Sequence, residues 1–184
     1  MKRSKNKNKV KESFKMKQFV IPISEEKRRL KELKYTLYTD GSCDNSNTKR
    51  GGWAAYIIDP NDDTWTISGA CEQTTSNRME MKAIIEGLDW ILNKYDKKMR
   101  KHVRVSLYSD STYCINLIRE WLKDWKEKGW DQRPNADLLP VLDEITSSCQ
   151  LQARWIPRNS SEGSSLCDKL ANEMRLQTKE EMTL

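Results

Sequence analysis

Three short runs of strand-forming residues follow one another in the chain, at 35–42, 53–58 and 64–71. The first run, Tyr35-Thr36-Leu37-Tyr38-Thr39-Asp40-Gly41-Ser42, alternates aromatic and β-branched residues and ends in Gly-Ser. Polar stretches separate the runs, and stretches of that composition turn the chain. Because consecutive strands with short connections pair with one another, the pattern predicts an antiparallel meander.

After the third run the apolar residues take up helical spacing over 78–94, which predicts an amphipathic helix. Two further strands are expected over 103–109 and 151–156, and three further helical segments over 111–128, 135–147 and 162–176. The order βββαβααβα predicts an α/β fold. Its centre is a five-stranded mixed sheet, with the first three strands antiparallel and helices flanking it.

The chain has 184 residues and a formal net charge of +6, so we expect one domain and an anionic partner, with nucleic acid the default. Residues 1–34 predict a basic extension that is largely disordered, with a short helix at 24–34. This extension is either an electrostatic tether to phosphates or a solubilising tail. We expect the folded domain at 35–178 and a tail at 179–184.

No apolar run approaches membrane-spanning length, and the basic N-terminus lacks the apolar core of a secretory signal. The five cysteines are scattered without a CxxC pair, which predicts neither a disulfide framework nor a zinc site. We therefore expect a monomer in the cytoplasm with no membrane partner.

Four acidic residues fall at comparable places in the predicted elements. Asp40 and Asp110 end the first and fourth strands, Glu80 lies in the first turn of the helix between them, and Asp168 lies in the first turns of the last helix. Carboxylates brought that close repel one another unless cations lie among them, and hard oxygen ligands suit magnesium or manganese. Each residue alone could equally be a turn former or a helix N-terminal acid.

Four blocks that contain these acids resemble the signature blocks of type 1 ribonuclease H. They are Thr39-Asp40-Gly41-Ser42, Thr75-Ser76-Asn77-Arg78-Met79-Glu80, Tyr108-Ser109-Asp110-Ser111-Thr112-Tyr113 and Leu166-Cys167-Asp168-Lys169-Leu170-Ala171. The resemblance covers residues 35–176 in order. It implies a ribonuclease H-like fold and endonucleolytic hydrolysis of the RNA strand of RNA–DNA hybrids, which leaves 5′-phosphate and 3′-hydroxyl ends. It also implies two Mg²⁺ ions, with Mn²⁺ as a substitute, held by Asp40, Glu80, Asp110 and Asp168.

The resemblance also implies a surface for each strand of the hybrid. Aromatic and basic residues interleave between residues 113 and 130, as in the basic protrusion that lines the DNA channel of cellular enzymes. The implied DNA contacts are Tyr113, Trp121, Trp125 and Trp130, with a phosphate pocket at Thr75 and Asn135. The implied RNA contacts are Cys43, Asn45 or Asn47, Ser76, Asn77 and Thr112. Two alternatives stay open: the tryptophans are core residues, or Thr75-Ser76-Asn77 caps a helix.

The loop before Asp168 departs from the family pattern, which usually has a mobile histidine there. This chain reads Pro157-Arg158-Asn159-Ser160-Ser161, a variant without histidine in which Arg158 stands at about that position. An arginine pairs with a phosphate but does not shuttle protons at neutral pH. We expect Arg158 to take part in catalysis, with turnover that is reduced or that depends differently on the metal.

Two competing functions predict sequence features that differ from those of a ribonuclease H. An exonuclease of the same fold superfamily typically has Asp-x-Glu in the first block, and here Ser42 is the second residue after Asp40. A non-catalytic module that binds hybrids or double-stranded RNA predicts that one of the ligand acids is missing, and none is. A reverse-transcriptase domain within a polyprotein is a further alternative, which the natural-looking tail disfavours.

Overall fold

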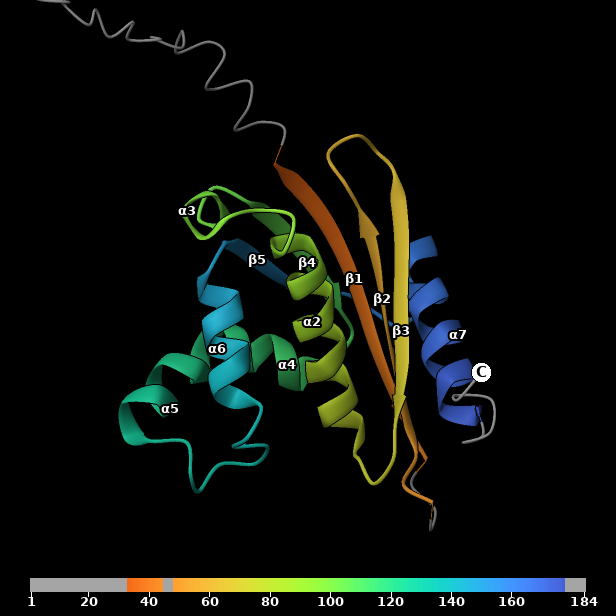
Figure 1. Cartoon of the computed structure of the whole chain (residues 1–184). Helices are drawn as coiled ribbons and strands as arrows, with labels where there is room; N and C mark the ends of the chain where they lie inside the picture. Colours follow the sequence, from red (N-terminus) through yellow and green to blue (C-terminus); the bar gives the residue numbers. More distant parts are fainter. Residues whose placement is uncertain (1–32, 45–47, 178–184) are drawn as a thin grey trace, which may run out of the picture.

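The computed structural model describes residues 33–44 and 48–177, in which five strands form one sheet with helices on both faces (Figure 1). The strands are β1 (Lys34–Cys43), β2 (Gly51–Ile58), β3 (Thr64–Cys71), β4 (Arg104–Ser109) and β5 (Gln150–Trp155). The helices are α2 (Ser76–Leu92), α3 (Lys97–Arg100), α4 (Thr112–Asn116), the π-helix η1 (Leu117–Trp121), α5 (Leu122–Lys128), α6 (Leu139–Ser147) and α7 (Glu162–Leu176).

The strand order across the sheet is β3-β2-β1-β4-β5. β2 is antiparallel to both β1 and β3, whereas β4 runs parallel to β1 and to β5. The predicted mixed sheet, with its first three strands antiparallel, is therefore confirmed. Because β1 and β4 are parallel neighbours, their carboxyl ends meet at the same edge of the sheet.

Helices pack on the two faces in different ways. α2 covers β1 and β2 from one side, where Leu37 and Ile57 of the sheet are fully buried against a cluster that includes Ile84 and Leu88 of the helix. α7 covers β2, β1 and β3 from the other side, as Figure 1 shows, and packs there through the small residues Cys167 and Ala171. The apolar spacing predicted for 78–94 is what gives α2 its buried face.

Several predicted boundaries differ from those in the structure. Lys34 begins β1, so the helix expected at 24–34 does not extend to its predicted end; the rest of the 1–34 extension and the tail at 179–184 lie outside the described residues. The helix expected from 135 begins at Leu139. Asn135 has a φ of 61°, a left-handed conformation that an α-helix excludes.

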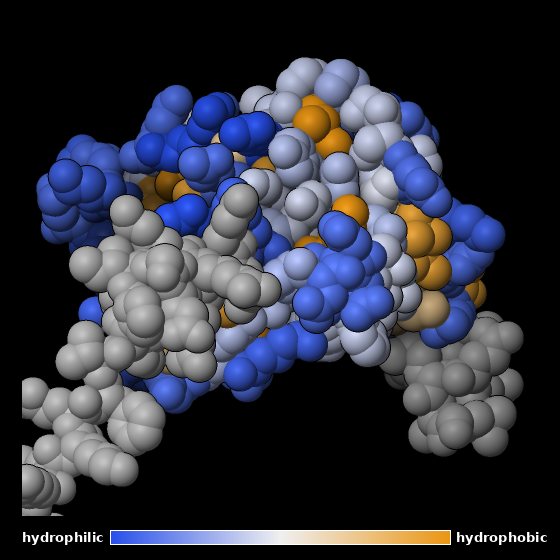
Figure 2. Space-filling view, turned by 90° about the horizontal axis from the view of Figure 1, so that it is seen from above, coloured by the Kyte–Doolittle hydropathy of each residue, from blue (hydrophilic) through white to orange (hydrophobic). Residues whose placement is uncertain are grey.

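The helix expected at 111–128 is a chain of three elements, α4, η1 and α5, because the hydrogen-bond pattern widens to a π-helix over five residues. All five cysteines are in the described part of the chain and are free, as predicted. No described helix is long and apolar enough to cross a membrane. Seen from above, the molecule is mainly hydrophilic, with small separate hydrophobic patches (Figure 2).

Because α7 and β2 are in close contact, adding one methyl group at Gly52 should destabilise the fold. A Cβ atom at Gly52 would collide with the carbonyl oxygen of Ala171, and backbone atoms cannot rotate away. We expect Gly52→Ala to lower the free energy of unfolding by about 1–3 kcal/mol, measured by urea denaturation. The exposed strand residue Thr66 provides the control, since Thr66→Ala should change the free energy by no more than about 0.5 kcal/mol. Equal stability of the two variants would contradict the packing described.

Candidate active site

Three acidic side chains from three elements meet at the carboxyl-end edge of β1 and β4. Asp40 lies just beyond Tyr38, the last residue of β1 that pairs with β4, and Asp110 directly follows β4. Glu80 is the fifth residue of α2. One carboxylate oxygen from each lies within 4.8 Å of the others. Parallel strand ends and a helix that begins beside them thus produce the convergence.

Two details of the predicted placement are wrong. β1 does not end at Asp40 but continues to Cys43, because its pairing with β2 outlasts its pairing with β4. Glu80 lies in the second turn of α2 rather than the first, because the helix begins at Ser76.

Close backbone packing holds β1 against the start of α2. A Cβ atom at Gly41 would collide with the backbone nitrogen of Glu80, so only glycine allows the strand to approach this closely. The Gly41 amide also donates a hydrogen bond of 2.9 Å to Asp40 Oδ1. The contact fixes the distance between the Asp40 and Glu80 carboxylates.

Asp168 lies at the rim of this cluster and not within it. It lines a small hollow together with Asp40, Asp110 and Arg158, but its carboxylate pairs with the guanidinium of Arg158. Arg158 Nε donates to Asp168 Oδ1 at 2.9 Å, and Nη2 makes a second contact to the same oxygen. The structure therefore brings three of the four predicted ligands together and places the fourth beside them in an ion pair.

The buried carboxylates are electrostatically strained. Burial, followed by the charges of Asp110 and Asp168, raises the pKa of Asp40 to about 6. Burial, followed by the charges of Asp40 and Asp110, raises the pKa of Glu80 well above its usual value. Asp40 Oδ2 and Glu80 Oε2 are buried and have no hydrogen-bond partner among the described residues. Buried oxygens of this kind, in an all-oxygen donor set, suit a hard divalent cation.

The indole of Trp155, which was not among the predicted site residues, positions one of these acids. Trp155 Nε1 donates a hydrogen bond of 3.0 Å to the backbone carbonyl of Asp110, although 51% of the residue is exposed. A single tryptophan at the end of a strand carries no signal of that contact in the sequence, because exposed apolar residues are common.

Three of the predicted RNA contacts, Cys43, Ser76 and Asn77, lie where β1 ends and α2 begins. Thr75 is the N-cap of α2, so the capping alternative holds for this residue, and Ser76 and Asn77 follow it on the surface. Cys43 Sγ contacts the carbonyl oxygen of Thr74 at 3.4 Å, which places the strand end next to these residues. Thr112 is exposed at the start of α4. Asn45 and Asn47 lie outside the described residues.

The predicted DNA contacts form an aromatic row along α4, η1 and α5. The rings of Tyr113 and Trp121 lie 5.9 Å apart, and those of Trp121 and Trp125 stack at 5.6 Å. Arg133, which the sequence analysis did not single out, places its guanidinium 5.1 Å from the Trp125 ring. The three predicted tryptophans, including Trp130, are partly buried against the core, so each combines a packing role with an accessible surface.

A bidentate ion pair joins the start of α2 to the turn before α6. Arg78 donates to both carboxylate oxygens of Asp137, at 2.8 and 2.7 Å. Asn135, in the same turn, donates to the hydroxyl of Tyr113 at 3.3 Å. The pair brings Thr75 and Asn135, the two residues of the predicted phosphate pocket, into neighbouring segments.

The chain matches known proteins over most of its length. The family model described as RNase H matches residues 32–175. The ribonuclease H of Thermoanaerobacter sp. (strain X514) is 41% identical over 146 residues, which cover 74% of this chain and 86% of that protein. The ribonuclease H of Bordetella pertussis is 35% identical over 143 residues, which cover 74% and 86%.

Two solved structures share the fold. LC9-RNase H1, a type 1 enzyme with the type 2 active-site motif, superimposes with a TM-score of 0.66 at 22% identity, covering 76% of this chain and 71% of that one. LC11-RNase H1 in complex with an RNA/DNA hybrid superimposes with a TM-score of 0.59 at 22% identity. The match covers 76% of this chain and 94% of that one. The family model and the sequence relatives together establish that this chain belongs to the ribonuclease H family of RNA–DNA hybrid ribonucleases.

Proposed function

We propose that the chain is an endonuclease that hydrolyses the RNA strand of RNA–DNA hybrids with two Mg²⁺ ions, leaving 5′-phosphate and 3′-hydroxyl ends. The observation that carries the proposal is the convergence of Asp40, Glu80 and Asp110 with two buried oxygens that lack a partner among the described residues. The hybrid bound to the related LC11-RNase H1 supports the choice of substrate.

In this proposal Asp40, Glu80, Asp110 and Asp168 hold the ions, and Mn²⁺ serves as a substitute for Mg²⁺. When bound, such ions lower the pKa of a water molecule and stabilise the departing oxygen of the phosphodiester. The four acids act only as ligands, so no side chain becomes covalently attached to the substrate. Trp155 holds the backbone of Asp110, and Gly41 lets Asp40 and Glu80 approach each other.

The two strands of the hybrid would lie on different surfaces. Deoxyribose lacks a 2′-hydroxyl, so the faces of Tyr113, Trp121 and Trp125 can cover the DNA strand without leaving a polar group unpaired. The exposed start of α2, with Ser76 and Asn77, offers polar groups to the 2′-hydroxyls of the RNA strand. The Arg78–Asp137 pair joins the start of α2 to the turn before α6, and Asn135 of that turn contacts Tyr113 of the aromatic row.

By the family resemblance, Arg158 stands at about the position where the family usually has a mobile histidine. Its side chain is 62% exposed, and it pairs with Asp168 at the rim of the site. We propose that the guanidinium neutralises Asp168 in the metal-free protein and pairs with a phosphate when substrate and metal are bound. The arginine would thereby assist turnover without transferring a proton.

A cleavage assay tests the proposed reaction. With the RNA and DNA strands of one duplex labelled separately, Mg²⁺ should produce internal cuts in the RNA strand alone. Asp110→Asn should abolish these cuts while hybrid binding in EDTA persists, because the amide keeps the shape but loses the charge that holds the ion. Cuts in DNA or from strand ends would favour an exonuclease, and binding by the parent without any cutting would favour a non-catalytic module.

Arg158→Ala should lower steady-state turnover without eliminating it. The expected reduction differs between Mg²⁺ and Mn²⁺, since the guanidinium acts beside the fourth ligand. Arg158→Lys provides the matched control because it keeps the charge and loses the fork that contacts Asp168 through two nitrogens. An unchanged rate of Arg158→Ala in both metals would remove Arg158 from the mechanism.

The raised pKa of Asp40 predicts how the metal-free protein responds to pH. A carboxyl with a pKa of about 6 when folded and about 3.9 when unfolded makes the folded state hold more protons, so stability falls as pH rises from about 4 to 6. The free energy of unfolding falls by about 3 kcal/mol at most, because the folded and unfolded pKa values differ by about two units and each unit corresponds to about 1.4 kcal/mol. Thermal unfolding in EDTA should show this fall in the parent and a smaller one in Asp40→Asn. Identical pH profiles would contradict the electrostatic account.

A further inference from the structure

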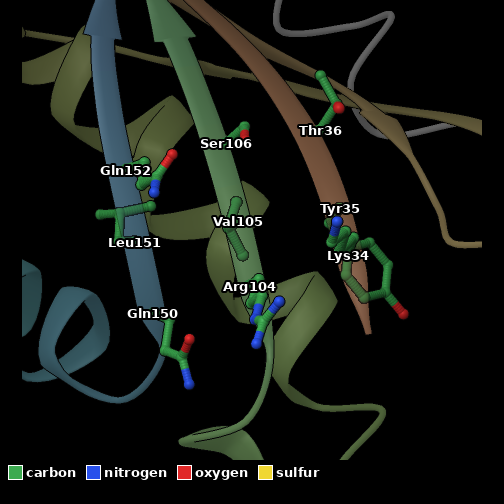
Figure 3. A pocket seen from close by; sticks show the side chains of 9 residues that line it. All are labelled: Lys34, Tyr35, Thr36, Arg104, Val105, Ser106, Gln150, Leu151 and Gln152. Atoms are coloured by element: carbon green, nitrogen blue, oxygen red, sulfur yellow. The ribbon is translucent and has the colours of Figure 1, made fainter. Parts of the chain in front are cut away.

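A second candidate binding surface lies at the opposite ends of the strands that carry the acids. A hollow of about 550 Å³ opens on the sheet where β1 and β4 begin, and side chains of β1, β4 and β5 line it (Figure 3). We call it the β1–β4–β5 hollow. Its polar residues stand in two cross-strand rows, which are Lys34, Arg104 and Gln150, and Thr36, Ser106 and Gln152.

The described helices cover only part of this face of the sheet, and the β1–β4–β5 hollow opens beside the covered part. Alternation along the strands buries Tyr35 and Val105 on the α2 side, while Lys34, Arg104 and Gln150 are exposed on the other. α7 packs on that other side mainly against β2, β1 and β3. Among the described residues, the face is therefore open where the hollow lies.

The charges of the hollow are of one sign. Lys34 and Arg104 are direct cross-strand neighbours, and none of the nine lining residues is acidic. Neither cation forms an ion pair with a carboxylate of residues 33–44 or 48–177. Like charges placed opposite each other in a sheet repel, so an anion between them would relieve the repulsion. The charge pattern thus calls for an anionic ligand.

The uncharged polar side chains beside the two cations indicate which kind of anion the hollow would bind. Two glutamines and two hydroxyl residues offer hydrogen-bond donors and acceptors beside the cations, which suits bases and sugars as well as phosphates. The outer two of the three strands lie about 10 Å apart, a width that suits one nucleic-acid strand lying across a sheet.

The next row of the same face continues toward the acids. Tyr38 and Tyr108 stack at 5.1 Å, and Arg154 lies 5.9 Å from the Tyr108 ring. Asp110 follows Arg104 by six positions along β4 and just beyond its end, which corresponds to about 20 Å in a strand. The hollow is therefore a place apart from the carboxylate cluster but on the same strands.

From these observations we infer that the β1–β4–β5 hollow is a second nucleic-acid site, which binds single-stranded DNA or RNA through Lys34 and Arg104. The chain's own residues 1–32 do not suit it, since they contain 12 lysines and arginines against four glutamates and would add positive charge to a positive surface. The inference concerns binding alone and does not depend on cleavage.

Fluorescence anisotropy of the full chain with a labelled oligothymidylate, in EDTA and over a series of salt concentrations, tests the inference. Lys34→Glu/Arg104→Glu should weaken binding by at least about tenfold and reduce the slope of log affinity against log salt by about 1.4, for two lost contacts to a single strand. Lys34→Gln/Arg104→Gln should give a smaller loss in the same direction.

Lys97→Glu/Lys98→Glu in α3 is the matched control, because it makes the same change in net charge on exposed residues that do not line the hollow. Circular dichroism confirms that each variant is folded. We expect this control to lose much less affinity for the oligothymidylate. We also expect the parent to keep binding the oligothymidylate when unlabelled blunt hybrid is added in excess. The inference is overturned if the Lys34 and Arg104 variants bind the oligothymidylate as tightly as the parent does. It is also overturned if the control variant loses as much affinity as they do, or if the hybrid displaces all of the bound oligothymidylate.

Discussion

Repulsion between buried carboxylates is the constraint on which the rest of the site depends. Asp40 is 6% exposed and Glu80 is 8% exposed, and each has a carboxylate oxygen close to one of Asp110. Burial and mutual repulsion both favour the protonated forms, so the metal-free site stores unfavourable energy. The fold tolerates this energy because the sheet and α2, which carry the acids, are anchored by a large apolar core.

The surrounding residues can be understood as ways of holding that arrangement. Gly41 lets a strand and a helix approach closely, and the indole of Trp155 fixes the backbone at Asp110. Arg158 supplies positive charge at the rim, where its interaction lowers the pKa of Asp40 against the larger effects that raise it. A divalent cation among Asp40, Glu80 and Asp110 would do the same more completely.

The sequence predicted those features that follow from local pattern. Alternation along 35–42 and 103–109 located the strands, and the parallel placement of β1 and β4 then accounts for the meeting of Asp40 and Asp110. Two individual tertiary contacts were not predicted. The Trp155 indole reaches a carbonyl 45 positions away, and the Arg158–Asp168 pair depends on how a loop folds back on α7.

The boundaries that were wrong have physical causes of the same kind. The start of α6 moved from 135 to Leu139 because the Arg78–Asp137 pair and the left-handed Asn135 stabilise a turn there. The π-helix at 117–121 could not be predicted from the sequence, because a widened hydrogen-bond pattern leaves the apolar spacing nearly unchanged. Helical periodicity specifies which face is buried but not how the backbone bonds are arranged along it.

If the Asp40, Glu80 and Asp110 carboxylates hold a divalent cation, calorimetric titration of Mg²⁺ at pH 6 will detect its binding. Run in two buffers with different ionisation enthalpies, the titration measures the protons released when the ion binds. Because burial and repulsion raise the pKa values of Asp40 and Glu80, we expect saturable binding with net proton release. Absence of binding, or a binding heat that is the same in both buffers, would contradict this expectation.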